Sequence, residues 1–315
     1  MKLLVVLSFL IFSISATAQM QCQDHFAEVF AIAGVESEGV DRPVAYITGT
    51  SSGIGEALAY EYAKQGYDLV ITARRMDKIQ AVAESIAQVH PKAKVVAIKN
   101  DVTKEGEVHQ SVRITHEYLK TISIVIANAG MSVSGDVADL PVDEFKRQFD
   151  TNVWGMIYTV QATIEDVRFN RGRVALVGSV IGDISFPGNS PYGMSKFAVR
   201  ALADSLRAEE KANGVKVVHI QPGFIATEFR RKDDTEPAVV QNEESDWVPT
   251  WMQMPAGTAA KQIFKAVKRG QREKILTAHG KIGVSLSRYA PGLMAWVKGF
   301  LAKKSNEQNL IEDKD

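Results

Sequence analysis

Short β-forming runs alternate with amphipathic helical patterns from residue 43 onward, and this alternation limits the chain to few folds. Strands are predicted at residues 44–48, 69–72, 94–98, 122–127, 174–178 and 215–220. Helices are predicted at 55–65, 77–90, 108–119, 142–167 with one break near Asp150, 190–212, 256–269 and 293–301. Strands and helices in this order form βαβ units, so we expect one α/β domain with a doubly wound parallel sheet and helices on both faces.

The first predicted strand runs into the segment TGTSSGIG, residues 48–55, in which three glycines precede a helix. Glycine allows the sharp turn and the close backbone approach that a pyrophosphate needs, and the helix N-terminus offers free N–H groups. Glycine triplets also occur in ordinary tight turns, but this one lies in the first βα turn. It predicts a single Rossmann-type domain whose dinucleotide contacts are Gly49, Ser51, Ser52, Gly53, Ile54 and Gly55.

The end of the second predicted strand reads Thr72-Ala73-Arg74-Arg75 and lacks the acidic residue that bonds the ribose 2′-hydroxyl of NAD. Two guanidinium groups suit a 2′-phosphate instead, so we expect NADP(H) to be preferred over NAD(H), with Arg74 and Arg75 as contacts. For Arg75 a solvated basic loop is an equally open interpretation.

Two further strand ends complete the predicted cofactor site. Asp101, followed by Val102, is placed to accept a hydrogen bond from the adenine amino group, although a turn or N-cap role is also open. Asn128, Ala129 and Gly130 end the fourth strand, where small residues let the chain pass beneath the cofactor.

Tyr192 and Lys196 lie four residues apart on a predicted helix and therefore share one of its faces, and Ser179 follows the fifth strand. Carbonyl reduction needs a proton donor beside the hydride site, and an ammonium group lowers the pKa of a phenol from its usual value of about 10. We expect Tyr192 to donate the proton, Lys196 to supply that charge and Ser179 to orient the substrate oxygen. Each residue alone is more typical of a structural role, so the prediction depends on the whole set. With one cysteine and six scattered histidines, no metal site is expected.

These motifs together resemble the short-chain dehydrogenase/reductase family over roughly residues 43–280. The resemblance is carried by TGTSSGIG (48–55), NAG (128–130), Ser179, YGMSK (192–196) and PGFIAT (222–227). It implies an NADP(H)-dependent oxidoreductase that moves a hydride between nicotinamide and a carbonyl or alcohol. A catalytically idle dinucleotide-binding sensor or scaffold is the alternative.

By the same resemblance, Asn152 is a fourth catalytic residue that holds a helix kink and a water linking Lys196 to solvent. Pro222, Gly223 and Thr227 would contact the cofactor together with Tyr192 and Lys196, and Thr227 would touch the nicotinamide carboxamide. A homodimer or homotetramer is implied, paired through the long helices at about 150–168 and 191–212. A substrate lid is implied at about 224–256.

The lid region contains WVPTWMQM, residues 247–254, which favours an apolar substrate, although the same residues are equally suited to core packing. Lys+Arg and Asp+Glu both number 37, so the net charge is zero and no nucleic-acid partner is expected.

The two ends of the chain suggest a location outside the cytosol. Lys2, an apolar run over 3–14 and Ala16-Thr17-Ala18 are typical of a signal peptide, residues 1–18, cleaved after Ala18 and followed by a polar leader, 19–42. An uncleaved anchor or an incorrect start is the other interpretation, and a cytoplasmic protein would then be possible. The C-terminal extension, 281–315, has an amphipathic stripe suited to peripheral membrane contact, although packing against the enzyme's own sheet or a sister subunit is favoured. The stripe consists of Leu293, Trp296, Val297, Phe300 and Leu301.

Overall fold

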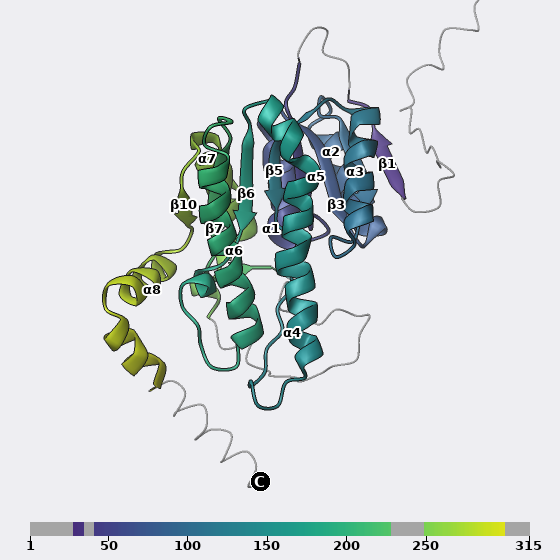
Figure 1. Ribbon diagram of the computed structural model, residues 1–315. Coiled ribbons are helices and arrows are strands. Elements are labelled where there is room, and N and C mark those ends of the chain that lie inside the picture. Colours follow the sequence, from purple (N-terminus) through teal and green to yellow (C-terminus); the bar gives the residue numbers. More distant parts are fainter. Residues whose placement is uncertain (1–27, 35–40, 228–248, 300–315) are drawn as a thin grey trace, which may run out of the picture.

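A sheet of eight strands forms the centre of the computed structural model, which describes residues 28–34, 41–227 and 249–299 (Figure 1). The strand order is β1-β4-β3-β2-β5-β6-β7-β10, and every neighbouring pair is parallel except β1 with β4. The sheet comprises β1 (Val29–Ile32), β2 (Val44–Thr48), β3 (Asp68–Ala73), β4 (Val95–Lys99), β5 (Ile122–Ala127), β6 (Arg173–Val177), β7 (Lys216–Gln221) and β10 (Glu273–Ile275). The predicted doubly wound α/β fold is confirmed, and the order reverses between β2 and β5, where such sheets bind ligands.

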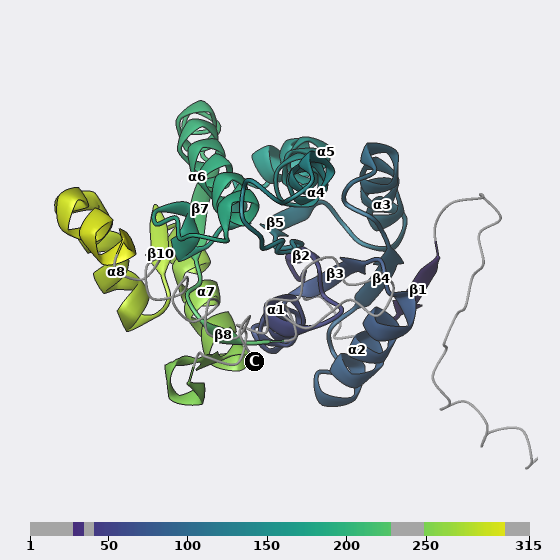
Figure 2. The same cartoon turned by 90° about the horizontal axis from the view of Figure 1, so that it is seen from below.

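Helices cover both faces of this sheet (Figure 2). One face carries α1 (Gly53–Lys64), α2 (Met76–Val89) and α7 (Ala256–Arg269). The other carries α3 (Glu105–Tyr118), α4 (Val142–Phe149), α5 (Gly155–Phe169) and α6 (Ser190–Glu209). The strands between them consist mainly of apolar and β-branched residues, as is typical of a sheet that is covered on both faces. Every residue of β2 and β3 is buried.

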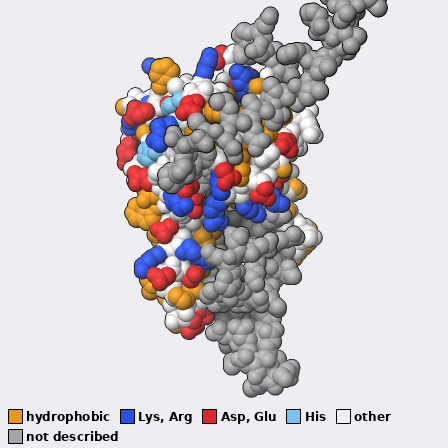
Figure 3. All heavy atoms as spheres, turned by 90° about the vertical axis from the view of Figure 1, so that its right-hand side faces the viewer, with side chains coloured by type: hydrophobic (Ala, Val, Ile, Leu, Met, Phe, Trp, Pro, Cys, Tyr) orange, Lys and Arg blue, Asp and Glu red, His pale blue; other side chains and the backbone are white. Residues whose placement is uncertain are grey.

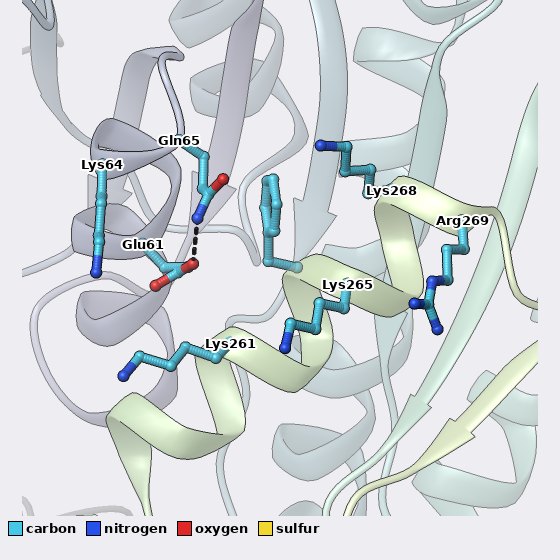
Figure 4. Close-up of a pocket in the computed structure, with 8 residues that line it drawn as sticks. Glu61, Lys64, Gln65, Lys261, Lys265, Lys268 and Arg269 are labelled. Atoms are coloured by element: carbon cyan, nitrogen blue, oxygen red, sulfur yellow. Dashed lines mark hydrogen bonds between the residues drawn. The ribbon is translucent and has the colours of Figure 1, made fainter.

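The packing of α1 against α7 shows how amphipathic helices build one of these layers. Tyr62 and Phe264 meet edge to face with their ring centroids 5.0 Å apart, and Tyr67 packs against both. The outer side of the same helices forms a hollow of about 670 Å³ (Figure 4), where Gln65 Nε2 donates to Glu61 Oε1 at 2.9 Å. Its other charged lining residues are Lys64, Lys261, Lys265, Lys268 and Arg269. Glu61, Lys64 and Gln65 lie at the C-terminal end of α1. The hollow is therefore distant from the glycine-rich turn, which precedes the N-terminus of the same helix.

Strand β1 lies inside the segment expected to be a polar leader, and this part of the prediction is wrong. Phe30 of β1 is buried against the core, and the strand pairs antiparallel with β4 from Val29↔Ile98 to Ile32↔Val95. The strand therefore adds one antiparallel strand at the edge of an otherwise parallel sheet. The proposed signal peptide, residues 1–18, lies outside the described residues.

The long helical stretch predicted over 142–167 is interrupted, as expected near Asp150, and the interruption is a π-helical turn at Asp150–Trp154. A π-turn inserts one residue into the helix and often occurs at functional sites. It separates α4 from α5 and carries Asn152, which is fully buried.

After β10 the chain forms α8 (Ala278–Tyr289), a helix that sequence reasoning missed, and then a helical segment over 291–299. Of the predicted stripe, Leu293 is 52% exposed and Trp296 is 69% exposed. The prediction that these two residues pack on the enzyme's own sheet is therefore wrong. Phe300 and Leu301 lie outside the described residues. No helix in the described part of the chain combines the length and apolar character needed to cross a bilayer.

Acidic and basic side chains lie close together on the side of the molecule that carries α3 and β1 (Figure 3). Lys99 of β4 pairs with Glu28 at 2.5 Å, and Lys120 pairs with Asp41 at 2.8 Å. These exposed pairs contribute little to stability, about 0–1 kcal/mol each.

Candidate active site

The glycine-rich turn between β2 and α1 has the backbone geometry that a phosphate cradle requires. Gly49 and Gly53 adopt φ values of +71° and +67°, which residues with a Cβ rarely adopt. A Cβ on Gly55 would overlap the Gly49 carbonyl oxygen, so this position excludes any larger residue. The N-cap residue Ser52 makes no side-chain capping bond, which leaves N–H groups of the first turn for an anionic ligand. The turn therefore fits the pyrophosphate of a dinucleotide.

The Asn128–Gly130 segment at the end of β5 braces this turn. Asn128 Nδ2 donates to the carbonyl oxygens of Thr48 at 2.9 Å and Gly49 at 3.3 Å. Thr48 Oγ1 accepts from the backbone N–H groups of Asn128 and Ala129, both at 3.0 Å. Asn128 thus holds the shape of the glycine-rich turn through the hydrogen bonds of its side-chain amide, and not only because it is small.

The arginine pair lies at the exposed end of β3, as expected. Arg75 Nη2 donates to Ser51 Oγ at 2.9 Å and to Ser52 Oγ at 3.3 Å. Arg75 therefore contacts the glycine-rich turn through two hydrogen bonds, whereas the side chain of a solvated basic loop would make no such contacts. Arg74 is exposed beside it.

The end of β4 shows a local role for Asp101. Its Oδ1 accepts from the Thr103 amide at 3.0 Å and from the Thr103 hydroxyl at 2.9 Å, so the side chain forms a turn, while Lys104 is the N-cap of α3. The contact with adenine stays a prediction. Val102 is buried against the start of α5, where a Cβ on Gly155 would lie 2.7 Å from Val102 Cγ2.

Tyr192 and Lys196 lie on α6, which begins at Ser190 with Pro191 in its first turn. Lys196 Nζ is 5.5 Å from the centroid of the Tyr192 ring and donates to the Val177 carbonyl oxygen at 3.0 Å. Burial lowers the pKa of Lys196 to about 8, because the charged ammonium is removed from water. The Lys196 amine is still mostly protonated at neutral pH, and its charge lies beside the Tyr192 ring.

Asn152 lies next to this pair. Its Oδ1 accepts from the Met131 amide at 2.9 Å, and its Nδ2 donates to the Met131 carbonyl at 3.0 Å and to Ser195 Oγ at 3.1 Å. A Cβ on Gly130 would lie 3.1 Å from Asn152 Oδ1 and 3.7 Å from Lys196 Nζ. Gly130 therefore keeps open the space between these two side chains, and a water linking Lys196 to solvent stays a prediction.

Ser179 begins a short 3₁₀ turn after β6, and we name residues 179–183 the catalytic turn. The Ser179 side chain is buried, and its Oγ accepts from the Ile181 amide at 3.2 Å. Pro222 joins this turn to the end of β7, because its carbonyl accepts from the Val180 amide at 3.0 Å. The carboxyl ends of β6 and β7 thus bring together two predicted site segments that lie far apart in sequence.

The PGFIAT segment reaches across to the glycine-rich turn. Thr227 packs there, since a Cβ on Gly53 would lie 3.1 Å from Thr227 Cβ. Ile225–Ala226 (β8) pairs with Met254–Pro255 (β9), which joins the two ends of the predicted lid. Most of the lid, including Trp247, lies outside the described residues, while Trp251 is 82% exposed and does not pack in the core.

Two features near the site were missed by sequence reasoning. His279 at the start of α8 stacks on Phe224, with ring centroids 5.2 Å apart, and a Cβ on Gly223 would lie 2.8 Å from its Nε2. Burial lowers the pKa of His279, which favours its neutral form. Asp183 ends the catalytic turn and bonds to three other elements. No local pattern marks either residue, because both gain their neighbours only through tertiary contacts.

The short chain dehydrogenase family matches residues 43–238 of this chain, more than half of its length. The chain belongs to this family. A dehydrogenase/reductase SDR family protein 7-like of Anopheles gambiae is 29% identical over 276 residues, which cover 84% of each chain. The 11-beta-hydroxysteroid dehydrogenase A of Sesamum indicum is 32% identical over 267 residues, covering 83% of this chain and 76% of the relative.

Solved structures agree on the fold of this short-chain dehydrogenase. A Burkholderia phymatum short chain dehydrogenase/reductase in complex with NAD has a TM-score of 0.72 and 21% identity, and covers 80% of this chain and 95% of its own. An alcohol dehydrogenase from Thermococcus sibiricus, complexed with 5-hydroxy-NADP, has a TM-score of 0.65 and 24% identity, with coverages of 76% and 97%.

Membership of the family defines the reaction class. This short-chain dehydrogenase is an oxidoreductase that acts on CH–OH or C=O groups of small molecules with a nicotinamide dinucleotide. The dinucleotide supplies or accepts the hydride when bound. The chain itself contributes a phenol, an ammonium and a hydroxyl, from Tyr192, Lys196 and Ser179, at one edge of the sheet. Such groups can donate a proton, stabilise the resulting phenolate and hold a carbonyl oxygen.

Proposed function

We propose that this short-chain dehydrogenase uses NADP(H) to interconvert an apolar carbonyl compound and its alcohol, with Tyr192 as the proton donor. The observation that carries the cofactor preference is the docking of Arg75 on Ser51 and Ser52, with Arg74 exposed beside it. Two guanidinium groups at the end of β3 favour the additional phosphate of NADP(H). Similar solved structures are complexed with 5-hydroxy-NADP in one case and NAD in another, so the preference depends on these residues of the chain itself.

An apolar substrate is supported by aromatic side chains near the two ends of the predicted lid. Trp251 in the lid region is 82% exposed. Phe224 adds an aromatic face beside the end of β7. Three relatives are named as 11-beta-hydroxysteroid dehydrogenases, which makes a steroid ketone a suitable member of a substrate panel.

Turnover by a Tyr192→Phe variant tests this function. The phenol oxygen is removed while the ring still packs, so we expect cofactor binding to be kept and NADPH oxidation to fall by at least ~10²–10⁴-fold. The panel would contain acetophenone, cyclohexanone and a steroid ketone. Tyr67→Phe is the matched control, because Tyr67 packs on Tyr62 and Phe264 at the far end of α1. Near-normal turnover by the Tyr192→Phe enzyme would exclude the phenol as the proton donor.

The proposed location is outside the cytosol or at a membrane, with cleavage after Ala18. The support is the signal-peptide pattern, together with the exposure of Leu293 and Trp296, which favours peripheral contact with a lipid surface or a sister subunit. Cell fractionation with N-terminal sequencing tests the location. A cytosolic protein that begins at Met1, or near residue 40, would contradict it.

A further inference from the structure

Asp183 connects the catalytic turn to three other elements through one buried carboxylate, of which 1% is exposed. Its Oδ1 accepts from Arg200 on α6 and from Arg288 Nε on α8, the latter at 2.9 Å. Its Oδ2 accepts from Gln221, the last residue of β7. α6 also carries Tyr192 and Lys196, and β7 leads directly to Pro222. The carboxylate therefore lies where the predicted catalytic elements converge.

The catalytic turn is short and internally bonded, so a displacement of Asp183 reaches Ser179. The Ser179 carbonyl accepts from the Gly182 amide, and the Val180 carbonyl accepts from the Asp183 amide, both at 3.0 Å. The turn also lies against the backbone of α6, because a Cβ on Gly182 would be 2.7 Å from the Lys196 carbonyl oxygen. Ser179, which begins the turn, and Lys196, whose backbone the turn contacts, are consequently both held by the packing of the turn on α6.

Helix α8 packs directly on the catalytic turn and the residue after it. A Cβ on Gly280 would lie 2.7 Å from Val180 Cγ1, and a Cβ on Gly283 would lie 2.9 Å from Ile184 Cδ1. Ser287 Oγ adds a hydrogen bond to the Asp183 carbonyl at 2.8 Å. The spacing of these residues places one face of α8 on the turn.

Arg288 fixes the end of that face. Its Nη1 and Nη2 donate to the two carboxylate oxygens of Glu273 on β10, at 2.8 and 2.9 Å, while its Nε reaches Asp183. With Arg200, the cluster contains two acids and two bases, so its charge is balanced. A planar guanidinium that bonds two carboxylates at once is a geometry that lysine does not reproduce.

We propose that Arg288 is a positioning residue for the reaction, which holds Ser179 in place through Asp183 and makes α8 part of the catalytic apparatus. The inference rests on the proposed role of Ser179 in orienting the substrate oxygen. A misplacement of about 1 Å at a catalytic group can lower the rate by about 10²-fold. A small shift of the turn is therefore enough to reduce turnover without unfolding the protein.

The test combines amide hydrogen exchange with kinetics on the full-length protein. In Arg288→Met, we expect exchange of the peptide covering the catalytic turn to accelerate about tenfold, while peptides of α2 are unchanged. We expect kcat with NADPH and the best ketone of the panel to fall about tenfold, with KM and the NADPH dissociation constant within about twofold, because the loss is confined to the transition state. Arg288→Lys should recover part of the loss.

Arg272→Met is the matched control, because Arg272 is 72% exposed and pairs with Asp204 away from the turn. Ser287→Ala removes only one hydrogen bond and serves if Arg288→Met does not fold; the same changes are expected at about threefold. Unchanged exchange or unchanged kcat in the folded variants would overturn the proposal. Failure of the proposed function would instead be seen in the wild-type enzyme, as absent turnover of every ketone.

Discussion

The buried histidine of β7, His219, makes the stability of this enzyme depend on pH in a way that one substitution can remove. The side chain is 2% exposed, and Nε2 has no hydrogen-bond partner among the described residues. Its pKa is lowered from 6.5 to about 4, chiefly because burial disfavours the charged ring. The carboxylates of Asp183 and Glu273 act in the opposite direction, and the charges of Lys196 and Arg200 contribute smaller decreases within the same net value. The folded protein therefore holds this imidazole neutral.

The sign and size of the effect follow from proton linkage. Between about pH 6.5 and 4 the unfolded chain binds a proton that the folded chain does not, so stability is complete above this window and falls as the pH falls through it. The full difference corresponds to about 3 kcal/mol of unfolding free energy. Between about pH 7 and about pH 5 the expected loss from His219 is about 2 kcal/mol.

Urea unfolding at these two pH values measures the effect, at one protein concentration. His219→Gln cannot take up the proton, so its unfolding free energy should fall by about 2 kcal/mol less than that of the wild type on acidification. His109→Gln, at an exposed position of α3, controls for the change from histidine to glutamine. Equal pH dependence in the wild type and His219→Gln would refute this account of the buried ring.

Three further predictions concern the cofactor, the glycine-rich turn and the assembly. Arg74→Ala should weaken NADPH binding by about 1.5–3 kcal/mol and leave NADH binding nearly unchanged, as measured by the two dissociation constants; equal weakening of both would show a purely structural role. Gly55→Ala should lower the unfolding free energy by about 1–3 kcal/mol and reduce dinucleotide binding, because its Cβ overlaps the Gly49 carbonyl, whereas Gly106→Ala, with open space around it, should not destabilise the protein. Light scattering should find a homodimer or homotetramer, consistent with the exposure of Trp154 and Phe169 on the helical layer, and a monomer would contradict this expectation.

Local patterns were enough to predict most of the fold. The strands at 44–48 and 122–127 and the helix at 256–269 were predicted with the bounds that the structure shows, because their hydrophobic periodicity spans the whole element. The glycine-rich turn was equally visible, since only glycine tolerates its backbone angles and its close contacts. Tyr192 and Lys196 were paired correctly because residues four apart on a helix share a face.

What local patterns did not contain was decided by contacts between distant parts of the chain. Strand β1 has four residues and exists because its backbone pairs with β4, so the segment was mistaken for a leader. Helix α8 and its contacts with the catalytic turn were missed, since Ser287 and Asp183 are 104 residues apart. Hydrophobic periodicity and backbone sterics are local properties, so they can be read from the sequence residue by residue. Other features depend on which surfaces meet when the chain is folded, and these include strand partners, buried charge clusters and the exposure of Leu293 and Trp296.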